Sequence, residues 1–382
     1  MDITLSEEQR MVREVAKRFL SEYCPPSFVR EVGKGEKDVT TELWPKIAEL
    51  GWLGLVLPDK YGGVGGSLMD LVILMEEMGA VCMPGPFMAS SILFASTLLR
   101  LGSEKQKQEL LPRIASGEII GTFALEEADC DYEPGGITVK AVECDGGYEI
   151  TGSKFFVPYA NIVNHIICVT KTGSSKEAEK NISVLLIDAK AKGLSYKGLK
   201  TISGGNQYYE VVFDKVRIPK ENLIGKKGKA WSSIKEVLQY ATVAQCAEMV
   251  GGGQRVLELA VAYAKIREQF GQVIGSFQAI RHHCANMLVD QDACRWITYK
   301  TAWMMEEEMP VTKQVSIAKA WCNEAHRRVI ATGHQVFGAI GYSEEHEMPL
   351  YFRKARMSEV FFGNANYHKK LIEEELFGGN LT

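Results

Sequence analysis

The sequence predicts an α+β protein with a helical N-terminal domain, a middle β domain of the barrel or sandwich type, and a C-terminal four-helix bundle. Its 382 residues exceed the roughly 250–300 residues at which single hydrophobic cores stop growing. The apolar spacing is helical at both ends of the chain and changes to short β-branched runs between them. We expect domains at residues 1–116, 117–227 and 228–382.

The N-terminal domain begins with a helix start signal. Ser6 and Gln9 have the spacing of a capping box, in which each residue satisfies a backbone N–H of the other. Apolar residues then recur at helical spacing, with Gly-Gly and Pro-Gly breaks between the stretches: Met11, Val15, Phe19; Leu43, Ile47, Leu50; Leu68, Leu71, Leu74, Met75, Met78. We therefore expect several helices up to about Ser116.

The middle domain is marked by β-branched and aromatic runs: Ile119–Leu125, Gly147–Val157, His165–Thr170, Ile182–Ile187 and Tyr208–Val216. Glycine-rich turns separate them, including Asp145-Gly-Gly147 and Ser203-Gly-Gly-Asn206. Short strands with turns between them predict a small antiparallel barrel or sandwich.

The C-terminal domain returns to the helical period. Its stretches are long and their connections short: Trp231–Phe270, Gln278–Glu308 and Thr312–Phe337. Three or four long helices with short connections are expected to pack as a bundle.

Composition excludes several classes of protein. The chain is 46% hydrophobic and 24% charged, with a net charge of −4, and its dispersed Lys and Arg residues exclude a nucleic-acid partner. No apolar run approaches the roughly 20 residues of a membrane span, so we expect no membrane insertion. Nine cysteines without a Cys-x-x-Cys pair exclude a zinc site and a disulfide frame. We reject a metal site at His282-His283, because adjacent helical residues point about 100° apart. The N-terminus lacks a signal peptide, which predicts a cytoplasmic protein.

Two segments of the C-terminal domain have the chemistry of a diphosphate site. One is Arg267-Glu-Gln-Phe270-Gly271 with Phe277-Gln278 after it, and the other is Gln335-Val-Phe-Gly338-Ala-Ile-Gly341. An Arg fork and a glycine turn at a helix end can bind a diphosphate. The first segment alone would more readily be an ordinary helix end capped by Gly271. The joint occurrence and spacing of both segments favour a cofactor site.

Together these segments resemble the FAD-binding half of the acyl-CoA dehydrogenase family, and the resemblance covers essentially the entire chain. It implies an oxidoreductase that dehydrogenates an acyl-CoA thioester between its α and β carbons, as in fatty acid or aromatic and alicyclic acid degradation. It implies an oligomer whose flavin site is shared between subunits, and an electron-transfer flavoprotein as acceptor. The FAD-binding residues that it implies are Arg267, Phe270, Phe277, Gln278, Gln335, Val336, Gly338, Ala339, Phe156, Val157, Pro158, Asn364 and Asn366.

The chain departs from the family pattern where the chemistry occurs. The expected catalytic glutamate is Phe362, and the alternative position for the base holds Ala241. Where the family has a glycine-containing loop beside the flavin ring, this chain has residues 126–133, with five carboxylates and no glycine. Pro158 replaces a threonine that would hydrogen-bond the flavin, and proline has neither a hydroxyl nor a backbone N–H.

Other acids must then be considered as the base. Glu359, Asp129 and Asp131 are candidates, although each is more readily explained as a solvent-facing charge. His368 is expected to be a surface or helix-capping residue. The catalytic residue is therefore unknown.

In these departures the chain resembles the subunits of heteromeric family members that lack the catalytic glutamate. This favours an acyl-CoA dehydrogenase subunit paired with a glutamate-bearing relative in a heterotetramer. The alternatives are a homotetramer with a relocated acid, non-redox chemistry such as decarboxylation of an acyl-CoA, and a non-catalytic structural subunit.

Overall fold

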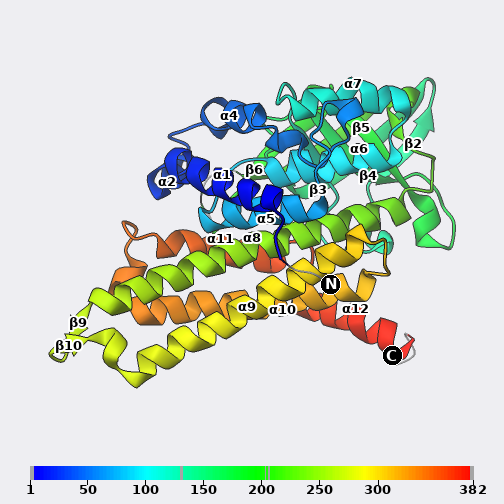
Figure 1. Ribbon diagram of the computed structural model, residues 1–382. Helices are drawn as coiled ribbons and strands as arrows, with labels where there is room; N and C mark the ends of the chain where they lie inside the picture. Colours follow the sequence, from blue (N-terminus) through cyan, green and yellow to red (C-terminus); the bar gives the residue numbers. More distant parts are fainter. Residues whose placement is uncertain (1–3, 130–131, 203, 205–206, 379–382) are drawn as a thin grey trace. The chain divides into compact units, whose positions relative to one another are not determined.

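The computed structural model describes residues 4–129, 132–202, 204 and 207–378 of the chain (Figure 1). The residues pack as two compact units. The bundle unit comprises Met1–Gly33, Ser67–Pro84 and Thr242–Thr382, and the sheet unit comprises Lys34–Gly66 and Gly85–Ala241. The predicted order of helical, sheet and helical segments along the chain is confirmed. The predicted domain limits stay a prediction.

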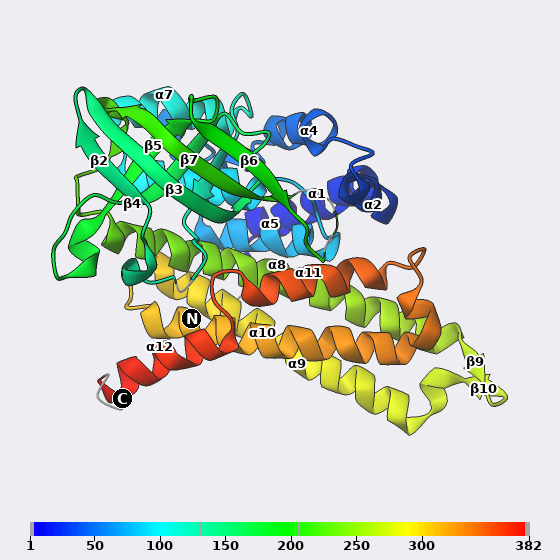
Figure 2. The same ribbon diagram turned by 180° about the vertical axis from the view of Figure 1, so that it is seen from behind.

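The bundle unit is helical. Its N-terminal helices are α1 (Glu7–Tyr23), α2 (Pro26–Lys34) and α5 (Leu68–Ala80). Its C-terminal helices are α8 (Trp231–Ile266, shared with the sheet unit), α9 (Gln278–Glu306), α10 (Thr312–Phe337), α11 (Met348–Val360) and α12 (Ala365–Phe377). Short elements are β9 (Glu268–Gln269), β10 (Gln272–Val273) and the 3-10 turns η7 (Ile274–Ser276) and η8 (Gly338–Tyr342). Figure 2 shows α9 and α10 running alongside each other as the long axis of the bundle.

The start of α1 is the predicted capping box. The Ser6 hydroxyl accepts a hydrogen bond from the Gln9 N–H (3.2 Å), and the Ser6 N–H donates to the Gln9 side chain (3.0 Å). Both bonds satisfy backbone donors that have no partner inside the helix.

A buried carboxylate joins the N-terminal helices of the bundle unit to α9. Glu76 is 6% exposed and accepts hydrogen bonds from Arg13 (3.1 Å), Arg295 (3.0 Å) and the Tyr299 hydroxyl (2.5 Å). A buried charge is tolerated when it is paired and its remaining lone pairs are satisfied. This network therefore ties α1 and α5 to α9.

Two glycines allow α5 and α8 to approach closely. A Cβ added at Gly79 would lie 2.0 Å from the Glu248 carbonyl oxygen, and one added at Gly251 would lie 1.7 Å from the Glu76 carbonyl oxygen. No side chain can occupy either position, so the crossing depends on both glycines.

The helices of the sheet unit are α3 (Val39–Glu42), α4 (Trp44–Glu49), α6 (Ala95–Leu101) and α7 (Glu104–Ala115), with a π-helical turn η3 (Met88–Phe94) before α6. Its 3-10 turns are η1 (Trp52–Gly54), η2 (Asp59–Tyr61), η4 (Pro134–Gly136), η5 (Ala178–Asn181) and η6 (Lys220–Asn222). Its strands are β1 (Gly121–Ala124), β2 (Lys140–Cys144), β3 (Gly147–Pro158), β4 (His165–Lys171), β5 (Ile182–Asp188), β6 (Leu194–Leu199), β7 (Tyr208–Pro219) and β8 (Leu223–Ile224).

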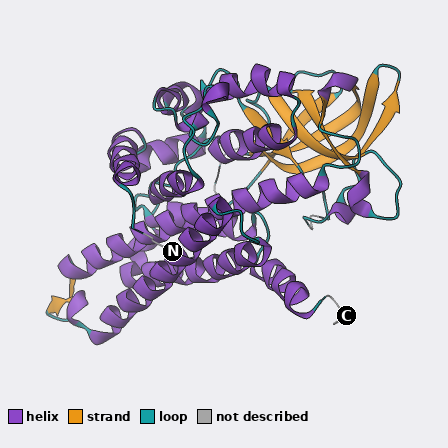
Figure 3. Cartoon of the chain, turned by 45° about the vertical axis from the view of Figure 1, so that its right-hand side comes forward, coloured by secondary structure: helices purple, strands orange, loops and turns teal. Residues whose placement is uncertain are grey.

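The strands form one eight-stranded sheet in the order β6-β7-β3-β2-β4-β5-β8, with β1 paired to β4. Figure 3 shows the strands of this sheet in orange. The sheet is mixed rather than purely antiparallel, because β1 and β2 both run parallel to β4. All five predicted strands are present. Strands β2, β6 and β8 were not predicted, because β2 has one buried side chain, β6 has none and β8 has only two residues.

Eight of the nine cysteines lie in the described part of the chain, and all eight are free thiols. Cys130 lies outside the described residues. Among the described helices, none combines the length and the apolar character needed to cross a bilayer.

Candidate cofactor site

The first predicted segment forms a hairpin between α8 and α9. Helix α8 ends at Ile266, and β9 and β10 pair around a two-residue turn of Phe270 and Gly271. Both turn residues have positive φ, 54° and 81°, as a type I′ turn requires. Gly271 is therefore a hairpin residue, and the interpretation of Gly271 as a helix cap is wrong.

The hairpin presents its side chains to solvent. Arg267 is exposed and, within the described residues, has no ion-pair partner, while Phe270 is 92% exposed. The Phe270 ring lies edge-on to Phe277, with centroids 6.1 Å apart. Gln278, the first residue of α9, is exposed as well. A guanidinium and a large aromatic ring are thus free to bind a ligand here.

The second predicted segment ends α10. Gly338 is the C-cap, with φ of 62°, and the 3-10 turn η8 follows it. Gln335, Gly338 and Ala339 are exposed, whereas the Val336 side chain is 4% exposed and belongs to the core. Any contact of Val336 with a ligand must therefore use its backbone.

These two segments lie at the same end of the bundle unit (Figure 1). Tyr263, one turn before Arg267 on α8, contacts the ring of Phe337 on α10 with centroids 4.8 Å apart. The structure thus brings together eight of the predicted cofactor residues: Arg267, Phe270, Phe277, Gln278, Gln335, Val336, Gly338 and Ala339.

The third predicted segment lies in the sheet unit, on β3. A bulge sets Phe156 in a left-handed conformation (φ 51°) with 42% of its side chain exposed, and Val157 is buried. The carbonyl oxygen of Pro158 accepts a hydrogen bond from the Thr122 hydroxyl (2.7 Å). Pro158 therefore offers no N–H donor, and its carbonyl oxygen already accepts one hydrogen bond.

The remaining predicted cofactor residues surround Phe362. Phe362 is half-buried, with φ of 58°. Asn364 caps α12, its side chain accepting a hydrogen bond from the Tyr367 N–H (3.0 Å), and Asn366 is exposed. His368 is 4% exposed and contacts the Phe362 carbonyl oxygen (2.8 Å). His368 was expected to be a surface or helix-capping residue; the surface location is wrong, because its ring is buried with Nε2 against the Phe362 carbonyl oxygen.

The candidate bases have other partners or environments. Glu359 pairs with Arg356 (2.9 Å) and Arg327 (3.8 Å). Asp129 is exposed in a turn of the sheet unit, and Asp131 lies outside the described residues. Ala241, at the alternative position of the base, is fully buried. Neither Phe362 nor Ala241, the two positions predicted for the base, carries a carboxylate.

The loop after β1 is built on a buried ion pair that the sequence analysis did not single out. Lys154 of β3 is fully buried and contacts the Glu127 carboxylate (2.7 Å), which also accepts hydrogen bonds from Thr138 and the Val139 N–H (3.1 Å). Burial opposes ionisation of Glu127, but the Lys154 charge and these bonds outweigh it and hold its pKa below the usual value. Glu127 is therefore a structural ion.

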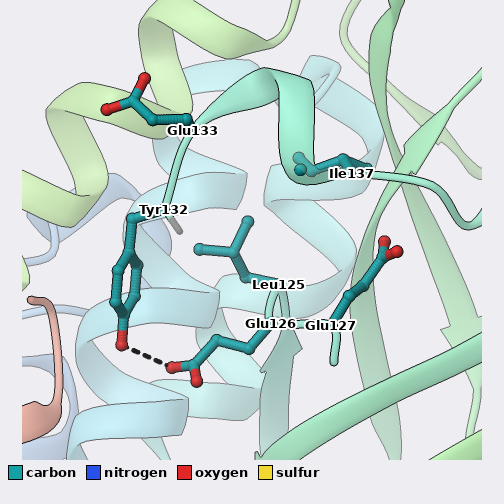
Figure 4. Close-up of a pocket in the computed structure, with 7 residues that line it drawn as sticks. Leu125, Glu126, Glu127, Tyr132, Glu133 and Ile137 are labelled. Carbon is teal, nitrogen blue, oxygen red and sulfur yellow. Dashed lines mark hydrogen bonds between the residues drawn. The ribbon is translucent and has the colours of Figure 1, made fainter. Parts of the chain in front are cut away.

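Glu126 points the other way, into a shallow pocket (Figure 4). Its carboxylate accepts a hydrogen bond from the Tyr132 hydroxyl (2.7 Å), and Glu133 and Ile137 complete the lining with Leu125, Glu127 and Gly136. The loop thus presents carboxylates and a phenol rather than a glycine backbone.

The bundle unit and the sheet unit differ in how well their residues fit FAD. At the end of the bundle unit, the exposed Arg267 and the open backbone at Gly338, where an added Cβ would meet no atom within 4 Å, fit the diphosphate and adenine end. In the sheet unit, Pro158 has no N–H to donate and the loop after β1 presents carboxylates, so neither supplies the donors expected beside the flavin ring.

Comparisons with known proteins agree over the whole chain. The profiles of the acyl-CoA dehydrogenase N-terminal and C-terminal domains match residues 6–118 and 228–377. The probable acyl-CoA dehydrogenase YngJ of Bacillus subtilis is 32% identical over 380 residues, covering 98% of this chain and 100% of YngJ. The subunit CarC of the caffeyl-CoA reductase-Etf complex of Acetobacterium woodii is 29% identical over 371 residues, covering 96% and 97%.

A solved complex is similar in structure. The ChsE4-ChsE5 complex from Mycobacterium tuberculosis contains a chain with a TM-score of 0.88 and 27% identity, covering 98% of this chain and 99% of that one. Fold, motifs and relatives agree, and the predicted family, cofactor and class of reaction are confirmed. The chain belongs to the acyl-CoA dehydrogenase family of FAD-dependent oxidoreductases that act on acyl-CoA thioesters.

Proposed function

We propose that this chain is the subunit of a heteromeric acyl-CoA dehydrogenase that completes a flavin site without carrying the catalytic base. In this reaction a carboxylate removes the α-proton of the thioester. FAD, when bound, accepts the β-hydrogen as a hydride. A glutamate-bearing relative supplies the base and the ring side of the flavin pocket.

The observation that carries the proposal is the chemistry at positions 362 and 241. Phe362 and the fully buried Ala241 have no group that accepts a proton. Loss of a general base typically slows a reaction by a factor of about 10²–10⁴. A chain without the base is useful when a partner provides it.

The exposed end of the bundle unit supports the same proposal. Arg267 is exposed on the hairpin, and Gln335 and Gly338 are exposed at the end of α10. The guanidinium supplies positive charge for a diphosphate. The Gly338 N–H itself donates to the His334 carbonyl oxygen, so backbone donors would come from the residues of η8 that follow it. These residues would hold the diphosphate of a flavin whose ring lies on the partner.

The relatives support the choice of partners. ChsE4-ChsE5 is a complex of two named chains, and CarC is a subunit of a complex that includes Etf. We therefore propose a heterotetramer with a related chain and an electron-transfer flavoprotein as the acceptor of electrons. The buried free thiols fit a reducing cytoplasm.

The test is co-expression of this chain with glutamate-bearing acyl-CoA dehydrogenases from the same genome, followed by measurement of FAD bound per complex. Arg267→Ala should lower the retained FAD at least tenfold, because it removes the guanidinium facing the diphosphate. Lys265→Ala is the matched control, since it removes an exposed positive charge two residues earlier and should leave FAD in place.

Two outcomes would contradict the proposal. Full retention of FAD by the Arg267→Ala complex would show that this end of the bundle unit does not hold the flavin. A homotetramer of this chain alone that binds FAD and oxidises acyl-CoA would favour a relocated acid.

A further inference from the structure

The turn that contains Phe362 is held by buried polar side chains from two helices of the bundle unit. Lys319 of α10 is fully buried, and its ammonium donates to the Ser358 carbonyl oxygen (2.5 Å) and the Asn323 side chain (2.8 Å). Asn323 is 1% exposed and donates to the Gly363 carbonyl oxygen (3.2 Å). His368 of α12 is within hydrogen-bond distance of the Phe362 carbonyl oxygen (2.8 Å).

Ordinary capping of α11 explains only one of these contacts. The last carbonyl groups of a helix need partners from outside it, and Ser358 O is one of them. Helix α11 ends at Val360, so the carbonyls of Phe362 and Gly363 lie beyond it. Asn323 and His368 therefore act on the turn itself.

The conformation of Phe362 indicates why the turn needs these contacts. Its φ of 58° lies in the left-handed region, which is strained for a bulky side chain. Such residues persist only where surrounding structure fixes them, and they cluster at functional sites. Two buried side chains, Asn323 and His368, contact the turn, and Lys319 holds Asn323 in place by donating to its side-chain oxygen.

We propose that Lys319, Asn323 and His368 are positioning residues that fix the backbone at position 362. The chain thus has the contacts that would position an active-site side chain, but the side chain at this position is a phenyl ring. Burial and the pKa values are consistent with this role. Burial lowers the pKa of Lys319 to about 8, which leaves the ammonium mostly charged at neutral pH, and burial lowers the pKa of His368 to about 4. The neutral imidazole donates its Nε2–H to the carbonyl.

The assignment of position 362 to an active site rests on the proposed function. The contacts of Lys319, Asn323 and His368 do not depend on the proposed function, because they all lie within one unit of this chain. A test that observes residue 362 directly can therefore fail independently of flavin binding and of the partner.

The test is fluorine NMR of the full chain with 4-fluorophenylalanine placed at position 362 alone. The variants are Lys319→Met, which keeps the apolar stem, Asn323→Leu, and His368→Phe, which keeps a ring against Tyr367. Each should shift or split the resonance of residue 362 toward that of the unfolded chain. A second label at Phe337, whose ring contacts Tyr263 and His346, should be unchanged.

A merely stabilising role gives a different result. If the variants lower the thermal midpoint while the resonance of residue 362 keeps its position and width, the proposal is wrong. If a variant does not fold, Asn323→Asp replaces it, because the carboxylate still accepts from Lys319 but cannot donate to Gly363. That variant should move the resonance of residue 362, and an unchanged resonance would overturn the proposal.

Discussion

The buried ion pair of Glu127 and Lys154 holds the loop after β1. Lys154 also donates to the Leu125 carbonyl oxygen (2.8 Å), so its ammonium binds the loop at two points. The pKa of Glu127 is depressed in the folded protein. The pair therefore stabilises the fold above the unfolded pKa of about 4.3 and loses this effect as the pH falls through the folded value.

Lys154→Met should lower the free energy of unfolding by about 3–5 kcal/mol, because it leaves a buried carboxylate without its counter-charge. Urea denaturation at neutral pH measures this. The double variant Glu127→Gln with Lys154→Met is the control and should lose less, since no charge stays buried. Equal losses in the single and double variants would show that the charge pair is not the cause.

Because of the buried His326, we expect the folded protein to lose stability in mild acid. It is 5% exposed, its Nδ1 has no hydrogen-bond partner within the described residues, and burial lowers its pKa to about 4. The unfolded chain takes up this proton below about pH 6.5, whereas the folded chain does not until near pH 4, so stability falls with pH in that window. One such group contributes about 2 kcal/mol between pH 7 and pH 5.

His326→Leu removes this contribution. Urea denaturation at pH 7 and pH 5 should show a smaller difference for the variant than for the wild type. His368 has a similarly lowered pKa, so part of the wild-type difference should remain. An unchanged difference would mean that His326 is protonated in the folded protein.

At the scale of elements, the crossing of α5 and α8 is set by glycine. Gly251→Ala should destabilise the bundle unit by at least about 2 kcal/mol, because overpacking forces backbone shifts and the new Cβ would meet a carbonyl oxygen at 1.7 Å. Gly252→Ala is the matched control on the same helix, since its nearest contact is 3.4 Å from His326 Cε1. Chemical denaturation of both variants tests this, and equal midpoints would contradict it.

The elements also show what local pattern can and cannot predict. Helix α10 has the predicted limits, Thr312–Phe337, because its apolar period is long and its end is marked by Gly338. The hairpin after α8 was missed, since its strands have two residues each and lack alternation. The sequence could predict that a regular element ends at Gly271. Only the tertiary structure distinguished a helix cap from a type I′ turn.

Sequence spacing predicted that Arg267 and Gln335 would serve one site, and this stays a prediction. The structure places their segments at one end of the bundle unit. Lys319, Asn323 and His368 were not predicted as a group, because residues on two helices meet only through packing. Buried polar residues such as Lys319, at helical spacing from Asn323, are the one signal that could have indicated them.

At the scale of the whole molecule, the central claim is that this chain provides half of a flavin site and lacks the base. The bundle unit carries the exposed segments that are predicted to bind the diphosphate, while Phe362 and Ala241 stand at the two positions predicted for the base. The claim predicts that binding of FAD and catalysis both depend on a second chain.

The most direct measurement is the visible absorption spectrum of this chain purified alone, with FAD added, before and after a panel of acyl-CoA thioesters. The account predicts little retained flavin and no bleaching by any thioester, because Pro158 and the acidic loop do not fit the ring and no base is present. A stoichiometric flavin band that bleaches with an acyl-CoA would contradict it and would show a self-sufficient dehydrogenase.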